Sequence, residues 1–183
     1  MRQFKINICD DSDDDILSAI SWKNTRAFKS IKHKKTQAKY YKENNSCDEV
    51  LQLVELDSKP FGEASEKIIC ELLQLGARTS SQNDATRNGK KIEIKSARYW
   101  KCEDECVWQH LEPNYDYDYA LFVLLDFQQW RIWGIKKSVL MGELTDKKIV
   151  TPQGNQGYWT KKSKILPYLT PIKSIDELDE FMS

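Results

Sequence analysis

Hydrophobic and polar positions follow two different periods along this chain, and the change of period separates helical from strand-forming stretches. Residues 63–77 carry apolar side chains at helical spacing, and we expect a helix there that ends at Gly76, a natural C-cap. Residues 59–62, Lys-Pro-Phe-Gly, are expected to break the chain before that helix. The apolar positions of the expected helix are Ile68, Ile69, Leu72, Leu73 and Leu75.

After this expected helix, polar and apolar residues alternate with a period of two. Residues 78–81 are expected to begin a strand, residues 87–89 (Arg-Asn-Gly) to form a hairpin turn, and residues 91–97 to alternate as the next strand. The almost continuous apolar run at residues 119–127 is typical of a buried strand. Residues 130–135 form a second strand across a short turn at Gln128 and Gln129.

Helices are expected at both ends of the chain, over residues 13–28 and 33–56, the latter with a break near residues 44–46. Ser174 and Glu177 form a capping box for a terminal helix to Met182. The succession predicts an α/β (α+β) fold with a central mixed β-sheet flanked by helices. We divide it into an N-terminal helical region (1–58) and a core (59–183), together one compact domain. The tryptophans assigned to the core are Trp100, Trp130 and Trp133.

Composition supports a folded domain. The chain has 183 residues, 40% hydrophobic and 11% aromatic, which excludes wholesale disorder. No apolar stretch approaches the roughly 20 residues of a membrane span. The first residues lack a secretory pattern, and we therefore expect a cytoplasmic protein without membrane association.

The net charge of zero hides strong segregation. Residues 21–45 carry 8 basic and 1 acidic side chains, residues 71–101 carry 7 and 3, and residues 129–164 carry 8 and 2. The acids lie between these blocks, with 7 of them and no base in residues 102–128. Two interpretations of the first basic block stand: solvated helix faces, or part of a cationic surface.

The sequence lacks the motifs of several common enzyme classes and metal sites. No phosphate-binding glycine loop, dinucleotide fingerprint, serine-hydrolase elbow or HExxH motif occurs. Five cysteines, an odd number, indicate reduced thiols. Cys102, Cys106 and His110 would share one side of a helix, but the spacing fits no common zinc site and a fourth ligand is missing.

The strongest chemical signal lies between residues 83 and 95. Glu93 and Lys95 project to one face of a strand, because strand side chains alternate, and the hairpin turn can bring Asp84 beside Glu93. Two close carboxylates repel unless a cation neutralises them, and Mg²⁺ prefers oxygen ligands. Such an ion activates water, and Lys95 could orient that water, so these are parts for phosphodiester hydrolysis.

At this point the sequence resembles the PD-(D/E)XK nuclease superfamily. The motif runs from Asp84 over eight residues to Glu93-Ile94-Lys95, with Asn83 in place of the motif's proline. The stretch NDATRNGKKIEIKSA is most similar to the small dimeric type II restriction endonucleases, and the match covers roughly residues 62–98. The resemblance implies a restriction-endonuclease-like core.

The resemblance also implies roles. Asp84 and Glu93 would hold Mg²⁺, for which Mn²⁺ could substitute, with help from the backbone carbonyl of Ile94, and Lys95 would serve the attacking water. Glu66 matches the accessory acid of many members. Glu63, one turn earlier, is the alternative, and the distance to Gly76 favours Glu66.

Candidate DNA contacts are more scattered. Base-reading residues of the small restriction enzymes follow the catalytic lysine, which here indicates Gln109 and His110, although a His110 with purely structural partners is an equal alternative. Residues 154–164 suit a nucleic-acid loop or an ordinary hairpin. The residues expected to grip the DNA backbone are Asn83, Lys90, Lys91, Arg98, Lys161 and Lys162.

The expected function is that of a Mg²⁺-dependent type II restriction endonuclease, which cuts both strands of a short site in double-stranded DNA. A palindromic site calls for a homodimer, to which residues 1–58 could contribute, and the resemblance implies a cognate DNA methyltransferase in the host without direct contact. Two rivals stand: a repair, recombination or mobile-element nuclease of the superfamily, and a catalytically inactive DNA-binding protein on this fold.

Overall fold

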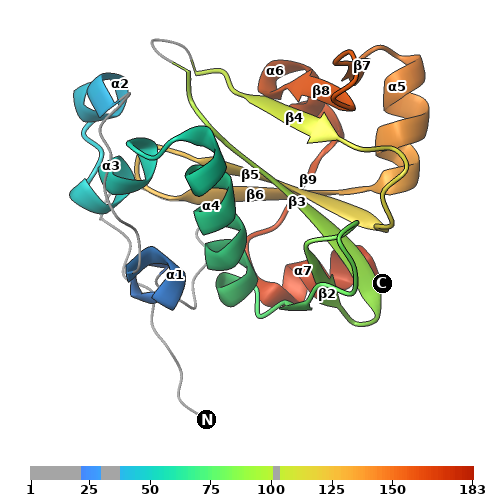
Figure 1. Ribbon diagram of the computed structural model, residues 1–183, viewed down its shortest axis with the longest axis horizontal. Coiled ribbons are helices and arrows are strands. Elements are labelled where there is room, and N and C mark those ends of the chain that lie inside the picture. The colour runs from blue at the N-terminus through green and yellow to red at the C-terminus, as the bar shows by residue number, and fades with distance from the viewer. Residues whose placement is uncertain (1–21, 30–37, 101–103) are drawn as a thin grey trace.

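The computed structural model describes residues 22–29, 38–100 and 104–183 (Figure 1). Its centre is a six-stranded sheet with the order β1-β2-β3-β5-β6-β9. β3 and β5 are parallel and the other neighbours are antiparallel, which confirms the predicted mixed sheet. Its strands are β1 (Gly76–Ala77), β2 (Ala85–Arg87), β3 (Lys90–Arg98), β5 (Tyr119–Leu125), β6 (Trp130–Lys136) and β9 (Thr170–Pro171).

A second, three-stranded sheet has the order β4-β8-β7 and crosses above the central one (Figure 1). The sequence pattern did not predict β4, where we considered a helix carrying Cys102, Cys106 and His110. That helix is not formed over residues 107–111, and Cys102 lies outside the described residues. The strands are β4 (Val107–Leu111), β7 (Thr151–Pro152) and β8 (Tyr158–Lys161).

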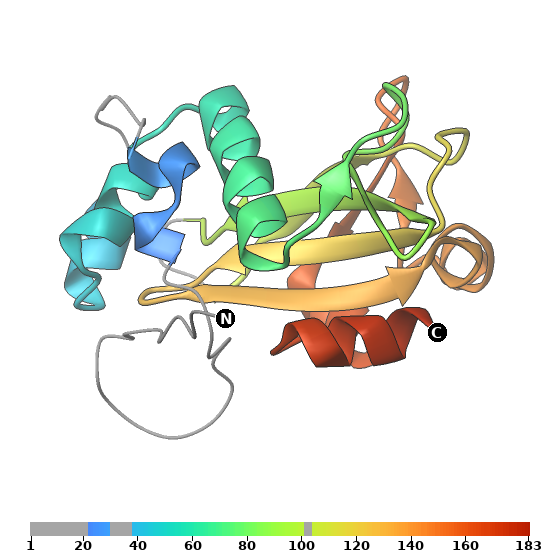
Figure 2. The ribbon, with the colours of Figure 1, turned by 90° about the horizontal axis from the view of Figure 1, so that it is seen from below.

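Helices cover both faces of the central sheet. Figure 2 shows α4 against one face and α7 against the other. The expected helix at residues 33–56 forms as two helices that are separated near the predicted break, and most of the one expected at residues 13–28 lies outside the described residues. The helices are η1 (Trp22–Asn24), α1 (Arg26–Lys29), α2 (Ala38–Glu43), α3 (Asp48–Val54), α4 (Ser58–Leu72), η2 (Val139–Glu143), α5 (Leu144–Asp146), α6 (Lys162–Ile165), η3 (Leu166–Tyr168) and α7 (Ile175–Met182).

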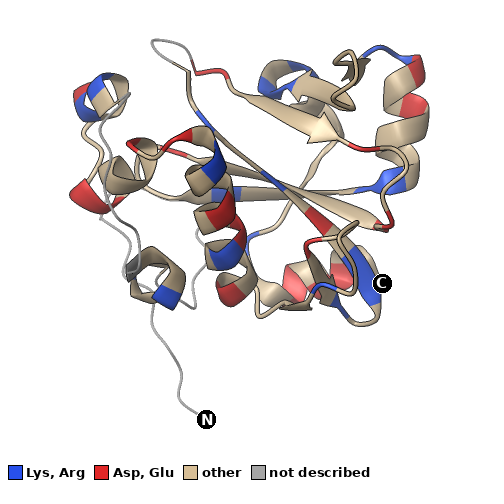
Figure 3. Cartoon of the chain, viewed as in Figure 1, with Lys and Arg blue, Asp and Glu red and all other residues tan. Residues whose placement is uncertain are grey.

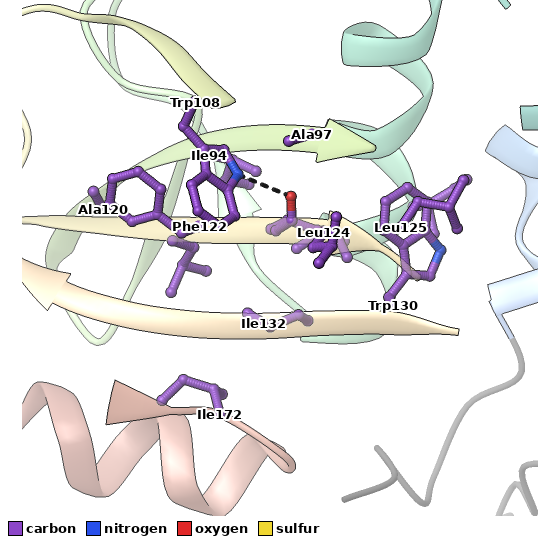
Figure 4. Packing of buried hydrophobic residues seen from close by; sticks show 14 of the residues in the cluster. Ile94, Ala97, Trp108, Ala120, Phe122, Leu124, Leu125, Trp130, Ile132 and Ile172 are labelled. Carbon is purple, nitrogen blue, oxygen red and sulfur yellow. Dashed lines mark hydrogen bonds between the residues drawn. The ribbon is translucent and has the colours of Figure 1, made fainter. Parts of the chain in front are cut away.

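The core lies around β5, whose seven residues are all buried. The indole of Trp108, from β4, packs over β3 and donates to the carbonyl of Val123 at 3.1 Å (Figure 4). This bond satisfies the one polar group of a fully buried tryptophan. On the opposite face, the hydroxyl of Tyr119 donates to the carbonyl of Met182 and anchors α7.

Local sequence signals were reliable where a turn or cap depends on neighbouring residues. Asn88 and Gly89 both have positive φ, 50° and 74°, and form the predicted two-residue hairpin between β2 and β3. The β5–β6 hairpin is confirmed. The capping box is confirmed as well, because the Ser174 hydroxyl accepts from the amide of Glu177 at 3.1 Å.

The predicted break at residues 59–62 is wrong, since these residues belong to the first turns of α4. Pro60 is the third helical residue, where its missing N–H costs no intrahelical hydrogen bond. A Cβ added at Gly62 would meet nothing within 4 Å, so this glycine marks an open place on the helix surface.

The end of α4 also differs from the prediction. The amide of Leu75 donates to the carbonyl of Cys70 at 2.9 Å, and Gln74 takes the left-handed conformation with φ of 51°. This is a Schellman cap with Gln74 in the position that glycine usually takes. Gly76 instead begins β1, where a Cβ would lie 2.7 Å from the Thr86 hydroxyl, and residues 78–81 form a loop rather than a strand.

Charged positions are interleaved in the described part of the chain. Figure 3 shows Lys and Arg on α2, α6, the β2–β3 hairpin and the loop after α5, with acidic positions between them. No helix in the described ranges is both long enough and apolar enough to span a membrane.

Candidate active site

The β2–β3 hairpin brings Asp84 near Glu93, close enough for its charge to raise the pKa of Glu93. Ala85 pairs with Ile92, so the residue before β2 faces the next residue of β3. The backbone amide of Asp84 donates to the carbonyl of Ile92 at 2.9 Å. Its carboxylate accepts from the amide of Ile94 at 2.7 Å. The expected juxtaposition of the two acids is therefore present in the structure.

These bonds also show where the backbone of β3 is accessible. β2 pairs only with residues 90–92, whereas β5 pairs with residues 92–98 on the other side. Because the N–H and C=O of one strand residue point in the same direction, the carbonyl of Ile94 faces the same edge as the Asp84 carboxylate. Ile94 thus presents a backbone oxygen beside Asp84, as the resemblance implies.

Glu93 and Lys95 form an ion pair within β3. The Lys95 Nζ lies 2.5 Å from Oε1 of Glu93, and the two side chains are 19% and 3% exposed. Burial raises the pKa of Glu93 to about 7. Lys95 opposes this shift, while Asp84 and then Glu66 add to it. The ionised form of Glu93 is buried beside other acids. An added positive charge near it would therefore stabilise this form.

Glu66 extends the acidic cluster from α4. Burial raises its pKa, with a further contribution from Asp84, and the positive charges of Arg78, Lys67 and Lys95 oppose this shift. Glu63, the alternative accessory acid, instead faces outward and pairs with Lys59 at 4.0 Å. The structure therefore brings Glu66, and not Glu63, toward the two motif acids.

A groove lined by residues of α4, β3 and β4 adjoins this cluster. Figure 1 shows where these three elements lie in the fold. The volume of the groove is about 500 Å³, within the range of sites for small ligands. Acidic groups, a lysine and an indole all contribute to its wall. The lining residues are Asp57, Ser58, Phe61, Gly62, Glu66, Asp84, Ile94, Lys95, Ser96, Ala97, Arg98, Trp100, Val107, Gln109 and His110.

Gln109 and His110 both reach this groove because β4 is irregular. Trp108 pairs with Thr160 and Leu111 with Tyr158, so two residues of β4 oppose only one of β8. His110 has a left-handed φ of 58°. This β-bulge exposes both neighbouring side chains, where a regular strand would bury one of them.

Two predicted DNA contacts have structural partners. The Arg98 guanidinium lines the groove but donates to the carbonyls of Leu53 and Val54, at the end of α3. The Asn83 side chain is 2% exposed and bonds Thr79 and Ser80 at 3.0 Å, closing the loop before β2. Asn83 therefore holds the loop that positions Asp84, and we do not retain it as a DNA contact.

The four predicted lysine contacts lie outside the described lining of the groove. Lys91 pairs with Asp116 at 2.5 Å, and Lys90 is exposed at the start of β3. Lys162 donates to the carbonyl of Asp104, whereas Lys161 is exposed at the end of β8. Any contact of these lysines with DNA would be made beyond the groove.

Two aromatic residues of the site were missed. Trp100, expected in the core, is 56% exposed and lines the groove. Tyr117 is 4% exposed, and its hydroxyl has no hydrogen-bond partner among the described residues. Burial raises the pKa of Tyr117, and the nearby negative charge of Glu93 raises it further. The polar residues that follow Trp100 in the sequence were a signal that it could be exposed. Nothing in the local sequence distinguishes Tyr117 from its neighbours as a residue near the site.

The cysteines in the described ranges belong to no metal-binding group. Burial raises the pKa of the Cys106 thiol to about 12 and that of Cys70 likewise, so both are neutral thiols. Across the described residues, no three His, Cys, Asp or Glu side chains converge as a metal-binding group.

The acidic cluster nevertheless suits Mg²⁺. Magnesium is commonly held by one or two carboxylates together with water and substrate phosphates, and it does not require a cage of protein ligands. Asp84 offers a carboxylate fixed by Ile94, and the carbonyl of Ile94 faces the same edge. Glu93 and Glu66 supply further carboxylate oxygens, and burial, with the neighbouring acids, raises the pKa of both carboxyl groups.

The chain matches no model of a known protein family, and no similar sequence was found among curated proteins.

Proposed function

We propose that this protein is a Mg²⁺-dependent endodeoxyribonuclease. The observation that carries the proposal is the bond from the amide of Ile94 to Asp84, which holds this acid opposite the buried Glu93–Lys95 pair. Glu66 adds a third acid from a different element. Three acids and a lysine beside a groove are groups that suit metal-assisted phosphodiester hydrolysis.

The residues of this chain have distinct tasks in that reaction. Asp84 and Glu93 would present oxygens to the cation, together with the carbonyl of Ile94 and Glu66. Lys95 donates from Nζ, and this group can orient the attacking water and offset negative charge on the phosphate. The bound cation would polarise the phosphate and acidify the water.

We extend the proposal to site-specific cleavage of double-stranded DNA by a homodimer, as in a type II restriction endonuclease paired with a host DNA methyltransferase. Its support is the resemblance at residues 83–98 and the position of Gln109 and His110 in the same groove as the acids. An amide can read adenine bidentately, and an imidazole can donate to guanine or to phosphate.

Plasmid DNA incubated with the protein and MgCl₂ tests the proposal. We expect discrete linear fragments, no product in excess EDTA, and 5′-phosphate and 3′-hydroxyl ends on sequencing. Cleavage confined to junctions or flaps would support a structure-specific nuclease instead. DNA binding without cleavage, under Mg²⁺ and under Mn²⁺, would indicate an inactive member of the fold.

A further inference from the structure

Trp100 is an unusual residue for the wall of a polar groove. At 56% it is the most exposed large hydrophobic side chain in the described part of the chain. Its backbone amide donates to the carbonyl of Glu105 at 3.2 Å. An exposed indole in the wall of a groove is a surface on which a flat ligand can stack.

The position of Trp100 relates it to the acidic cluster. The part of β3 from Lys95 to Arg98 spans about 10 Å of extended chain, and Trp100 follows two residues after Arg98. Both Lys95 and Trp100 line the same groove. A strand of nucleic acid with its phosphate at Lys95 would therefore carry a neighbouring nucleotide toward Trp100.

The rest of the wall offers polar groups for such a ligand. The bulge in β4 turns Gln109 and His110 into the groove, and Asp57 at the start of α4 makes no capping hydrogen bond with its side chain. Amide, imidazole and carboxylate groups are those that pair with the edges of nucleobases. A backbone bulge of this kind commonly re-aims side chains beside a functional site.

We infer that Trp100 stacks on a nucleobase that has left the duplex stack. In a duplex each base has neighbours on both faces and presents only its edge, so an indole can stack only on an unstacked base. This inference rests on the proposed nuclease function, and it assigns the groove to one unstacked nucleotide near the scissile phosphate.

Oligonucleotide binding tests the inference without cleavage. The full chain carrying Asp84→Asn is titrated with a fluorescent single strand and with its duplex, in Ca²⁺, and affinity is measured by anisotropy. Adding Trp100→Ala should weaken binding roughly 5- to 150-fold, the range for the loss of one stacked base. Trp100→Phe should bind within a few-fold of its parent. Tyr168→Ala, which removes an aromatic residue of 38% exposure outside the groove lining, should have no effect.

Tryptophan emission gives a second readout that a purely structural role would not change. Oligonucleotide should quench the emission of the parent, and this quenching should be lost in Trp100→Phe although the oligonucleotide still binds. Unchanged affinity in Trp100→Ala, with quenching retained in Trp100→Phe, would overturn the inference.

The cleavage assay separates this inference from the proposed function. If the wild type cuts plasmid but Trp100→Ala binds as tightly as its parent, only the stacking role fails. If no cation supports cutting but binding depends on Trp100, the nuclease proposal fails and stacking stands. A parent that binds no oligonucleotide refutes the stacking role whatever the cleavage result.

Discussion

The amide of Ile94 donates to the Asp84 carboxylate at 2.7 Å, at the point where the pairing of β2 with β3 ends. The side chain of Asp84 thus adds one hydrogen bond to β3 beyond the last backbone pair between β2 and β3. This gives the carboxylate a structural task, which needs an acceptor oxygen, and a chemical task, which needs a negative charge.

Substitutions at Asp84 separate the two tasks. Asp84→Asn keeps an oxygen that accepts from Ile94, so its free energy of unfolding should stay within about 1 kcal/mol of wild type, while cleavage falls by about 100-fold or more. Asp84→Ala should lose cleavage and also about 1–2 kcal/mol of stability, because the Ile94 amide loses its acceptor. Plasmid cleavage and urea unfolding measure the two effects. Wild-type activity in Asp84→Asn would remove this residue from the site.

The raised pKa of Glu93 predicts how stability depends on pH. Its pKa rises from an ordinary 4.5 in the unfolded chain to about 7 in the folded protein. The unfolded state therefore releases its proton first as pH increases. The contribution of Glu93 to the free energy of unfolding is fully favourable below pH 4.5. It declines between pH 4.5 and about pH 7 and stays lost at higher pH. The difference amounts to about 3 kcal/mol at most.

This dependence is measured by unfolding wild type and Glu93→Gln in EDTA from about pH 5 to about pH 8. The stability of wild type relative to Glu93→Gln should fall over this range. Mg²⁺ should stabilise wild type more at the upper end, because it binds the ionised carboxylate. Equal stabilisation by Mg²⁺ at both ends would show that Glu93 does not hold the ion.

Two buried tyrosines should respond differently to loss of the hydroxyl. The Tyr41 hydroxyl donates to the carbonyl of Leu125 at 2.6 Å and accepts from the amide of Tyr99 at 2.9 Å. Tyr41→Phe should cost about 1–3 kcal/mol, because two buried backbone groups lose their partner. Tyr117→Phe removes a hydroxyl without a partner among the described residues, so stability should be unchanged or higher. Urea unfolding compares the two variants. An equal loss of stability in both would contradict the different hydrogen bonding of the two hydroxyls.

Arg87 and Asp179 connect the hairpin to the C-terminal helix. Arg87 donates to both oxygens of Asp179, at 2.5 and 2.6 Å, and Asn88 donates at 2.8 Å. Since the pair is partly exposed, Asp179→Ala should cost only about 1–2 kcal/mol. The Arg87 hydrogen bonds lower the pKa of Asp179, so the contribution is present above an ordinary 3.8 and is lost as pH falls below it. Glu180→Ala, at an exposed position of the same helix, is the control and should leave thermal unfolding unchanged.

The sequence by itself determined the features that depend on near neighbours. The Asn88-Gly89 turn, the capping box at Ser174 and the buried strand at residues 119–125 each rest on hydrogen bonds or side-chain alternation within a few residues. The approach of Asp84 to Glu93 was predictable for the same reason, because a two-residue turn sets the register of both strands.

Only the tertiary structure decided which distant side chains meet. The choice of Glu66 over Glu63 depends on how α4 packs on β3, and Trp100 lines a groove whose wall comes from α4, β3 and β4 together. Likewise, Arg98 is bound to the end of α3, a helix more than forty residues earlier. Such contacts come from the packing of whole elements, and the local pattern of polar and apolar residues does not encode them.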